Sequence, residues 1–280
     1  MSHHLSFLKY HGSGNDFILL HRLPQELSAG ILAQKLCQRH RSIGADGLLC
    51  LYDQEGVDAA LSIYNADGSE PSFCGNGLLC AARYLYERIG VERPLISCPA
   101  GLFCCHHLPD SDGMSLLFLA SREPPRRHEL LSEATGLPCY WVHTGVPHLV
   151  LLSTRPLPTE QLTSLGRFVR HHESLSPEGS NATFCWQIDG QLQLCTYERG
   201  VEAITEACGS GAMAAALAAH CHWALLPPFT LMTKQGDPLQ VQFRLVNDRV
   251  EALSLAAAAT YSFSGEVFLP CELLVKSSVS

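Results

Sequence analysis

The chain has 280 residues, of which 46% are apolar and 16% charged, and its formal net charge at pH 7 is −8. This length fits one large domain or two domains of about 140 residues, and the apolar content excludes a disordered protein. The negative charge argues against nucleic acid or an anionic membrane as a partner.

The chain contains 13 cysteines, fewer per residue than a scaffold held together by disulfides. No Cys-x-x-Cys pair occurs, so zinc ribbons and thioredoxin-type redox motifs are not supported. The first residues lack the basic and apolar regions of a secretory signal. The most apolar stretch, residues 212–226, is too short and too polar to span a bilayer. We therefore expect a reduced, cytoplasmic protein without a membrane segment.

Several short segments have recognisable secondary-structure patterns. Apolar residues at helical spacing in 27–36 predict an early amphipathic helix. Alternation over 57–64 predicts a half-buried strand, and Asp189-Gly190 between two alternating runs predicts a hairpin. Asp46-Gly47 and Asp67-Gly68 are interpreted as turns. Many antiparallel strands with few helices favour an α+β fold over a doubly wound parallel sheet.

An internal repeat is the most informative pattern. Cys74-Gly75-Asn76-Gly77 and Cys208-Gly209-Ser210-Gly211 each open an alanine-containing apolar run, and the two cysteines lie 134 residues apart. The repeat predicts two similar halves, 1–120 and 121–264, joined at the proline- and charge-rich segment 121–127. The last segment, 265–280, is expected to return to the first half.

Each motif places a cysteine at the start of a central helix. A helix N-terminus exposes free backbone N–H groups and partial positive charge, so it binds carboxylates and favours thiolate over thiol. Two such starts could remove a proton from one face of an α-carbon and deliver a proton to the other face. This chemistry requires no metal or pyridoxal cofactor. A single motif of this kind is more often a buried cysteine in tight helix packing.

The chain also resembles the diaminopimelate epimerase family along nearly its whole length. The motifs that carry the resemblance are His11-Gly12-Ser13-Gly14-Asn15-Asp16-Phe17, Ile43-Gly44-Ala45-Asp46-Gly47-Leu48, Asn65-Ala66-Asp67-Gly68-Ser69-Glu70, Pro147-His148, Asn181, Tyr197-Glu198-Arg199-Gly200 and the two cysteine motifs. The resemblance implies two pseudo-symmetric halves, each a mostly antiparallel sheet around a central helix. It also implies a cofactor-independent epimerase that interconverts LL- and meso-diaminopimelate for lysine and peptidoglycan biosynthesis, and it makes a homodimer plausible.

The resemblance implies specific roles for residues. Cys74 and Cys208 would be the acid–base pair, and Arg199 would bind the distal carboxylate through a guanidinium fork. His148 and Glu198 would lie close to the sulfurs and orient them. The remaining implied residues all bind substrate: through the backbone, Gly75, Asn76, Gly209 and Ser210; through side chains, Asn15, Asn65 and Asn181. Taken by themselves, Asn15 and Asn65 would be turn residues, His148 a loop histidine, and Glu198-Arg199 a solvated surface pair.

Two departures from the family pattern affect these expectations. Val146 stands where the family has asparagine. The loss of this polar contact predicts weaker discrimination at the distal amino group and glutamate racemisation as a side activity. The segment 201–207 is one residue longer than usual, which predicts a shift of Glu198 relative to the sulfur.

Two other functions stay open at this point. One is a proline or hydroxyproline racemase, which also uses paired cysteines, and the other is a non-catalytic amino-acid-binding protein. The clusters 104–107 and 220–222 lack ordinary zinc-ligand spacing, so no metal site is expected.

Overall fold

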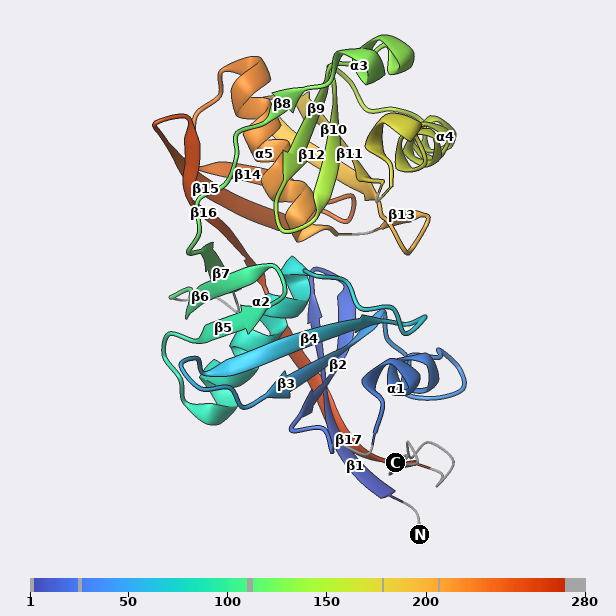
Figure 1. Cartoon of the computed structure of the whole chain (residues 1–280), viewed down its shortest axis with the longest axis vertical. Helices are drawn as coiled ribbons and strands as arrows, with labels where there is room; N and C mark the ends of the chain where they lie inside the picture. The colour runs from blue at the N-terminus through green and yellow to red at the C-terminus, as the bar shows by residue number, and fades with distance from the viewer. Residues whose placement is uncertain (1–2, 25–26, 110–112, 178, 206, 270–280) are drawn as a thin grey trace. The chain divides into compact units, whose positions relative to one another are not determined.

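The computed structural model describes residues 3–24, 27–109, 113–177, 179–205 and 207–269. The chain divides into two compact units, Met1–Met114 with Ala258–Ser280, and Ser115–Ala257 (Figure 1). The domain boundaries expected from the sequence, after residues 120 and 264, stay a prediction. Residues 270–280 of the expected returning segment lie outside the described residues.

The first unit is built on one mixed sheet. Its described strands are β1 (His3–Gly12), β2 (Asn15–His21), β3 (Gly47–Tyr52), β4 (Ala59–Asn65), β5 (Leu95–Cys98), β6 (Gly101–His107) and β17 (Thr260–Leu269). They pair in the order β17-β1-β2-β3-β4-β5-β6. The β2–β3 and β4–β5 pairs are parallel, and the other pairs are antiparallel. The strand β7 (Gly113–Phe118) crosses the boundary between the units.

The second unit repeats this pattern of pairing. Its described strands are β8 (Arg126–Arg127), β9 (Cys139–His143), β10 (Pro147–Ser153), β11 (Asn181–Ile188), β12 (Gln191–Tyr197), β13 (Ile204–Thr205), β14 (Phe229–Met232), β15 (Pro238–Val246) and β16 (Arg249–Ala258). They pair in the order β8-β9-β10-β11-β12-β14-β15-β16, with β13 beside the end of β12. Again two pairs are parallel, β10–β11 and β12–β14.

Each parallel pair is joined by a connection that contains a helix, as a parallel pairing requires. In the first unit these helices are α1 (Ala29–Leu36) and α2 (Gly75–Tyr84), and in the second they are α4 (Thr159–Arg170) and α5 (Gly209–Trp223). Reading along the chain, the elements from β1 to β6 therefore match those from β9 to β15. The predicted α+β fold of two similar halves is confirmed.

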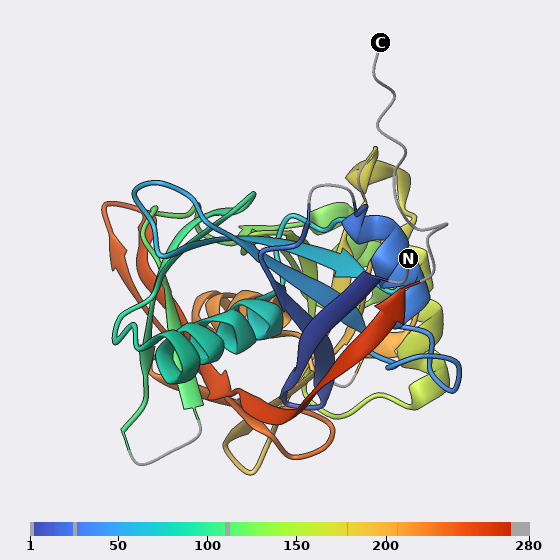
Figure 2. The ribbon, with the colours of Figure 1, turned by 90° about the horizontal axis from the view of Figure 1, so that it is seen from below.

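The helices α2 and α5 are central to their units. Figure 2 shows α2 within the curve of the first unit's strands, and it contacts both outer and inner strands of that sheet. The first eleven residues of α5 are all buried, so its apolar, alanine-rich surface is covered on every side. Alanine suits this position because it favours the helix and lets strands approach closely.

The other helices lie outside this arrangement. The helix α1 packs on β3 and β4, and α4 packs on β11 and β12. The inner strands are thus covered on both faces, which explains why every residue of β10 is buried. Shorter elements complete the described part: the helix α3 (Glu129–Thr135), a π-helical turn (Leu85–Ile89) and a 3₁₀ turn (Glu173–Leu175).

Local predictions met different outcomes. The early helix forms as α1, and Ile188 pairs with Gln191 across Asp189-Gly190, both with positive φ, as the hairpin requires. Asp67-Gly68 is a turn, with Gly68 at φ +86°. The prediction of a turn at Asp46-Gly47 is wrong, because Gly47 begins β3. A Cβ there would lie 2.8 Å from the Tyr64 carbonyl oxygen, so this glycine permits close strand packing.

The described helices include none that is long and apolar enough to cross a membrane.

Candidate active site

Cys74 and Cys208 cap the two central helices in the same geometry. Each precedes the first helical residue with extended backbone, φ −142° and ψ 113° for Cys74 and φ −135° and ψ 103° for Cys208. Each sulfur accepts a hydrogen bond from the backbone N–H three residues later, at 3.4 Å from Gly77 and 3.4 Å from Gly211. The cysteines thus take the place of the serine or aspartate that usually caps a helix. Both sulfurs lie in the positive field of a helix N-terminus.

In both α2 and α5, close packing requires glycine at the third helical position. A Cβ on Gly77 would lie 2.9 Å from a methyl carbon of Leu49. A Cβ on Gly211 would lie 2.6 Å from Thr196 Oγ1 and 3.1 Å from Thr183 Oγ1. The bare backbone therefore lets each helix start sit directly against the neighbouring strands.

Two predicted site residues lie beside Cys74. The Cys74 thiol donates to Asn15 Oδ1 over 3.9 Å, and Asn76 Nδ2 donates to the same oxygen over 3.4 Å. Asn76 is 1% exposed, so its amide is held inside the first turn of α2. Asn15 opens β2 directly after the tight turn at Ser13-Gly14, which brings it over the helix start.

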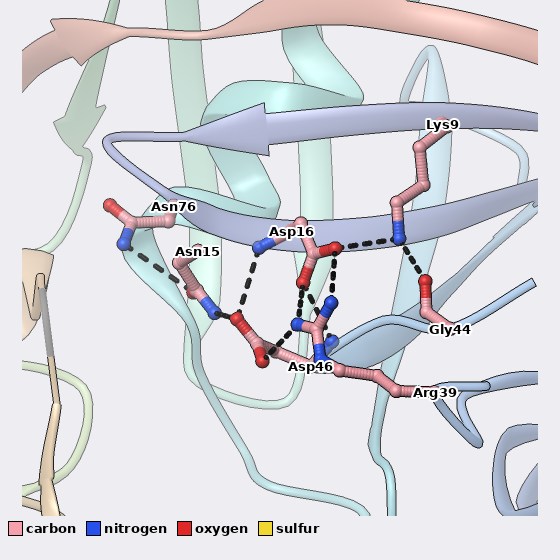
Figure 3. Close-up of polar contacts among 7 residues, drawn as sticks. All are labelled: Lys9, Asn15, Asp16, Arg39, Gly44, Asp46 and Asn76. Carbon is pink, nitrogen blue, oxygen red and sulfur yellow. Dashed lines mark hydrogen bonds and ion pairs between the residues drawn. The ribbon is translucent and has the colours of Figure 1, made fainter.

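Asn15 is held in turn by a network of charges (Figure 3). Its Nδ2 donates to Asp46 Oδ2 over 2.9 Å. Arg39 donates to both Asp16, at 2.6 Å, and Asp46, at 2.9 Å. Lys9 forms an ion pair of 2.8 Å with Asp16 and also donates to the Gly44 carbonyl. Two cations and two carboxylates therefore balance each other beside the Asn15 amide.

Ionisation states in the network follow from these contacts. Burial by itself would raise the pKa of Asp16, but the hydrogen bonds from Arg39 and Lys9 outweigh it and hold the pKa below its usual value. The same hydrogen bonds to Asp16 and Asp46 raise the pKa of Arg39. Asp16 is thus a carboxylate and Arg39 a cation at neutral pH.

Asn65, the other asparagine expected in the first unit, ends β4 in a turn. Its Nδ2 donates to Ser69 Oγ over 2.9 Å, and its backbone N–H donates to the Ser69 carbonyl over 2.8 Å. The turn interpretation thus describes its local contacts, and its binding role stays a prediction.

In the second unit, Ser210 connects Cys208 to His148. Ser210 Oγ lies 3.4 Å from Cys208 Sγ and 2.9 Å from His148 Nε2. The Ser210 carbonyl accepts a hydrogen bond of 2.8 Å from the Thr144 hydroxyl, which fixes this first turn of α5 against the start of β10. The Ser210 hydroxyl therefore links His148 to the Cys208 sulfur.

The network assigns the proton position on His148. The Arg199 N–H donates to Asn181 Oδ1 over 2.7 Å, so the other end of that amide is Nδ2, a donor. This Nδ2 lies 3.4 Å from His148 Nε2, which must therefore be the acceptor. Nδ1 then carries the proton and donates to Thr183 Oγ1 over 2.9 Å.

Burial keeps this imidazole neutral. His148 is fully buried, and desolvation, with smaller contributions from His143 and Arg199, lowers its pKa to about 3. A neutral imidazole with Nε2 as acceptor orients the Ser210 hydroxyl but does not store a proton at neutral pH. The predicted orienting role of His148 is compatible with this state.

Glu198 and Arg199 follow β12. The Glu198 carboxylate accepts a hydrogen bond from the Thr205 hydroxyl, and the Glu198 N–H donates to the Ala203 carbonyl over 3.1 Å. Residues 201–205 therefore fold back onto Glu198, with Ala203 and the β13 residue Thr205 as its partners. The roles of Glu198 and Arg199 at substrate stay predictions.

Sequence reasoning missed several residues of these networks. In the first unit they are Lys9, Arg39 and Asp46, and in the second they are Thr144, Thr183 and Thr196. Asp46 stood within a quoted motif but was interpreted as a turn residue. The threonines carry no local signal. Thr183 and Thr196 meet only when β11 and β12 pair, and Thr144 reaches the Ser210 carbonyl from the turn before β10.

Most other cysteines are ordinary core residues. All twelve cysteines in the described part of the chain are free thiols. Burial raises the pKa of Cys37, Cys50 and Cys185 to about 12 each, so these thiols stay protonated.

The fold is shared with solved structures of epimerases and isomerases. A hydroxyproline epimerase from Agrobacterium vitis, solved with bound trans-4-hydroxy-L-proline, matches with a TM-score of 0.71 at 17% identity. The match covers 95% of this chain and 93% of that chain. At this identity the likeness defines the fold class alone.

Sequence comparison defines the family within that class. Residues 7–108 match the family described as diaminopimelate epimerase. The diaminopimelate epimerase of Methanothrix thermoacetophila is 34% identical over 255 residues, covering 85% of this chain and 89% of its own length. That of Hydrogenobaculum sp. is 31% identical over 256 residues, covering 86% and 92%. The chain belongs to the diaminopimelate epimerase family.

Proposed function

We propose that this protein interconverts LL- and meso-diaminopimelate by transferring protons at the α-carbon through Cys74 and Cys208. Family membership and the resemblance of the site motifs support the substrate. The reaction would supply meso-diaminopimelate for lysine and peptidoglycan biosynthesis.

The observation that carries the mechanism is the matched capping geometry of the two cysteines. Equivalent positions in two repeated halves have the same extended backbone, the same N–H···S hydrogen bond of 3.4 Å, and glycine at the first and third helical positions that follow. Buried cysteines that only fill space need none of these features, and a non-catalytic binding protein needs no sulfur at either helix start.

The proton steps balance without a further reactant. A thiolate at one cysteine takes the α-proton, which leaves the electron pair on the α-carbon and adjacent carboxylate. The thiol of the other cysteine then gives its proton to the opposite face of that carbon. After turnover the two sulfurs have exchanged protonation states, and the reverse reaction uses them in the opposite order.

Helix N-termini would stabilise the charge that develops during this step. The backbone N–H groups of Gly75 and Asn76, and of Gly209 and Ser210, belong to the first turns of α2 and α5. The first N–H groups of a helix point toward its N-terminal end, where a bound anion can accept from them. They would bind the reacting α-carboxylate, where negative charge accumulates as the proton leaves.

Deuterium incorporation tests the proposal. Wild type, Cys74→Ser and Cys208→Ser would be incubated with LL- or meso-diaminopimelate in heavy water. Serine can still cap each helix, so the variants avoid the loss of about 0.5–2 kcal/mol of stability that removal of a cap would cause. Its hydroxyl does not ionise near neutral pH and so cannot replace the thiolate base. Both variants should lose epimerisation by at least about a hundredfold while melting like wild type.

Cys221→Ser is the matched control, because Cys221 is an exposed cysteine on α5, the helix that Cys208 caps. It should epimerise normally. A Cys74→Ser or Cys208→Ser variant that epimerises like wild type would overturn the two-cysteine mechanism. Proline, hydroxyproline and glutamate should be assayed in parallel, and turnover of any of these without turnover of diaminopimelate would overturn the proposed substrate.

A further inference from the structure

Asp46 determines which end of the Asn15 amide faces Cys74. An asparagine side chain has a donor end and an acceptor end of nearly equal size. A carboxylate oxygen accepts hydrogen bonds, and Asp46 Oδ2 lies 2.9 Å from Asn15 Nδ2. Asn15 Oδ1 is therefore the end that faces Cys74 Sγ, at 3.9 Å, and Asn76 Nδ2, at 3.4 Å.

Asp46 is itself held on three sides. Arg39 Nη2 donates to its Oδ1 over 2.9 Å, and the Asp16 N–H donates to its Oδ2 over 3.2 Å. The Asp46 N–H donates in return to Asp16 Oδ1 over 3.0 Å. These reciprocal contacts tie the start of β2 to the residue that precedes β3, where the two strands run parallel (Figure 3).

Ion pairs within the network hold Asp16 and Asp46 in place. The Lys9 side chain is 7% exposed and the Asp16 side chain 18% exposed, so neither can turn to solvent without breaking its pair. Arg39 bridges both carboxylates, so Asp16 and Asp46 cannot move independently. The Asn15 amide therefore links this network to the Cys74 thiol.

We infer that Asp46 is a positioning residue that fixes the Asn15 amide with its oxygen toward the Cys74 thiol. The oxygen stabilises the protonated thiol, whereas the opposite amide orientation would place a donor there and stabilise the thiolate. The catalytic meaning of this assignment rests on the proposed function, but the contact itself can be tested without turnover.

The test is Asp46→Asn, in which an amide of the same size can face Asn15 with either end. Alkylation of Cys74 by iodoacetamide would be followed against pH by peptide mass spectrometry, with exposed Cys221 as the internal reference. We expect the pH midpoint for Cys74 to fall by about half to one unit, with an unchanged plateau rate at high pH, as the loss of one hydrogen bond to the thiol would produce.

Asp53→Asn is the matched control. Asp53 directly follows β3, as Asp46 directly precedes it, and it pairs with Arg22 at 2.9 Å. It should leave the Cys74 profile unchanged, because its contacts are at the other end of the strand. A changed Cys74 plateau with an unchanged midpoint in Asp46→Asn means altered access only, and this result would overturn the inference. An unchanged profile would overturn it as well.

A kinetic arm separates this inference from the proposed function. With diaminopimelate as substrate, Asp46→Asn should lower kcat more than it raises KM. A shifted Cys74 midpoint in a protein that does not turn over diaminopimelate would support the positioning role and reject the proposed substrate. A normal midpoint in an active epimerase would do the reverse.

Discussion

The His148 imidazole and the Ser210 hydroxyl are joined by a hydrogen bond of 2.9 Å that connects β10 to the first turn of α5. Because Nε2 is the acceptor, the hydroxyl proton points toward the imidazole and the oxygen lone pairs are turned toward the Cys208 thiol. The neutral His148 thus orients the Ser210 hydroxyl, which in turn faces the Cys208 thiol. In the first unit, the Asp46 carboxylate orients the Asn15 amide, which faces the Cys74 thiol in the same way.

The buried state of His148 should make the fold sensitive to mild acid. Its pKa of about 3 in the fold lies below the usual 6.5 of an unfolded histidine. Its contribution to stability is therefore full above pH 6.5 and decreases as pH falls from 6.5 toward about 3, by up to about 1.4 kcal/mol per unit. His148→Gln should remove this part of the slope in urea unfolding measured across that range. His106→Gln, at an exposed site on β6, should retain the wild-type slope.

Thr183→Val should destabilise the second unit, although valine has nearly the same shape as threonine. Thr183 Oγ1 accepts from His148 Nδ1 over 2.9 Å and lies 3.1 Å from Thr196 Oγ1. Valine leaves a fully buried imidazole N–H without its acceptor, at a cost of about 1–3 kcal/mol. Urea unfolding at neutral pH measures the loss. Thr183→Ser retains the hydroxyl and should recover most of the lost hydrogen-bond energy, and equal losses for both variants would refute the assigned proton position.

Alanine should be tolerated better at Gly77 than at Gly211. The nearest atom to a Cβ at Gly77 is a methyl group at the end of the Leu49 side chain, which can rotate away. At Gly211 the nearest atoms are two threonine hydroxyls fixed in the His148 network, at 2.6 and 3.1 Å. We expect Gly211→Ala to cost about 1–3 kcal/mol and Gly77→Ala less. Thermal melting of both variants checks the order, and adding Thr196→Ala should recover part of the loss in Gly211→Ala.

Asp16→Asn should weaken the first unit most at neutral pH. The substitution leaves Lys9, 7% exposed, without its carboxylate partner, at a cost of about 3 kcal/mol or more. Because the pKa of Asp16 is held below 3.8, the wild-type advantage is present above that pH and disappears as pH falls through the lowered value. Melting curves from neutral to acid pH should therefore converge. Asp53→Asn, at an exposed ion pair, should follow wild type throughout.

The repeat and the helix starts could be predicted because their signals are local. Glycines beside Cys74 and Cys208, and the Asp189-Gly190 turn, encode backbone conformations that the sequence shows directly. The parallel pairs β2–β3 and β10–β11 could not be predicted, because burial on both faces removes the alternation that marks a strand. The same is true of the polar networks. Lys9, Arg39 and Asp46 stand 30 and 7 residues apart, and their charges meet only after β2 and β3 pair.

The pairing of β17 with β1 has a consequence for the order in which the protein folds during synthesis. Residues 115–257 form a continuous stretch and can collapse as soon as they have left the ribosome. The first unit, although made first, has β1 as an open sheet edge until Thr260–Leu269 arrives from the far end of the chain. The unit that carries Cys74 is therefore begun first and completed last. A chain that stops near residue 257 would leave β1 as a long, unpaired edge strand that is prone to aggregation.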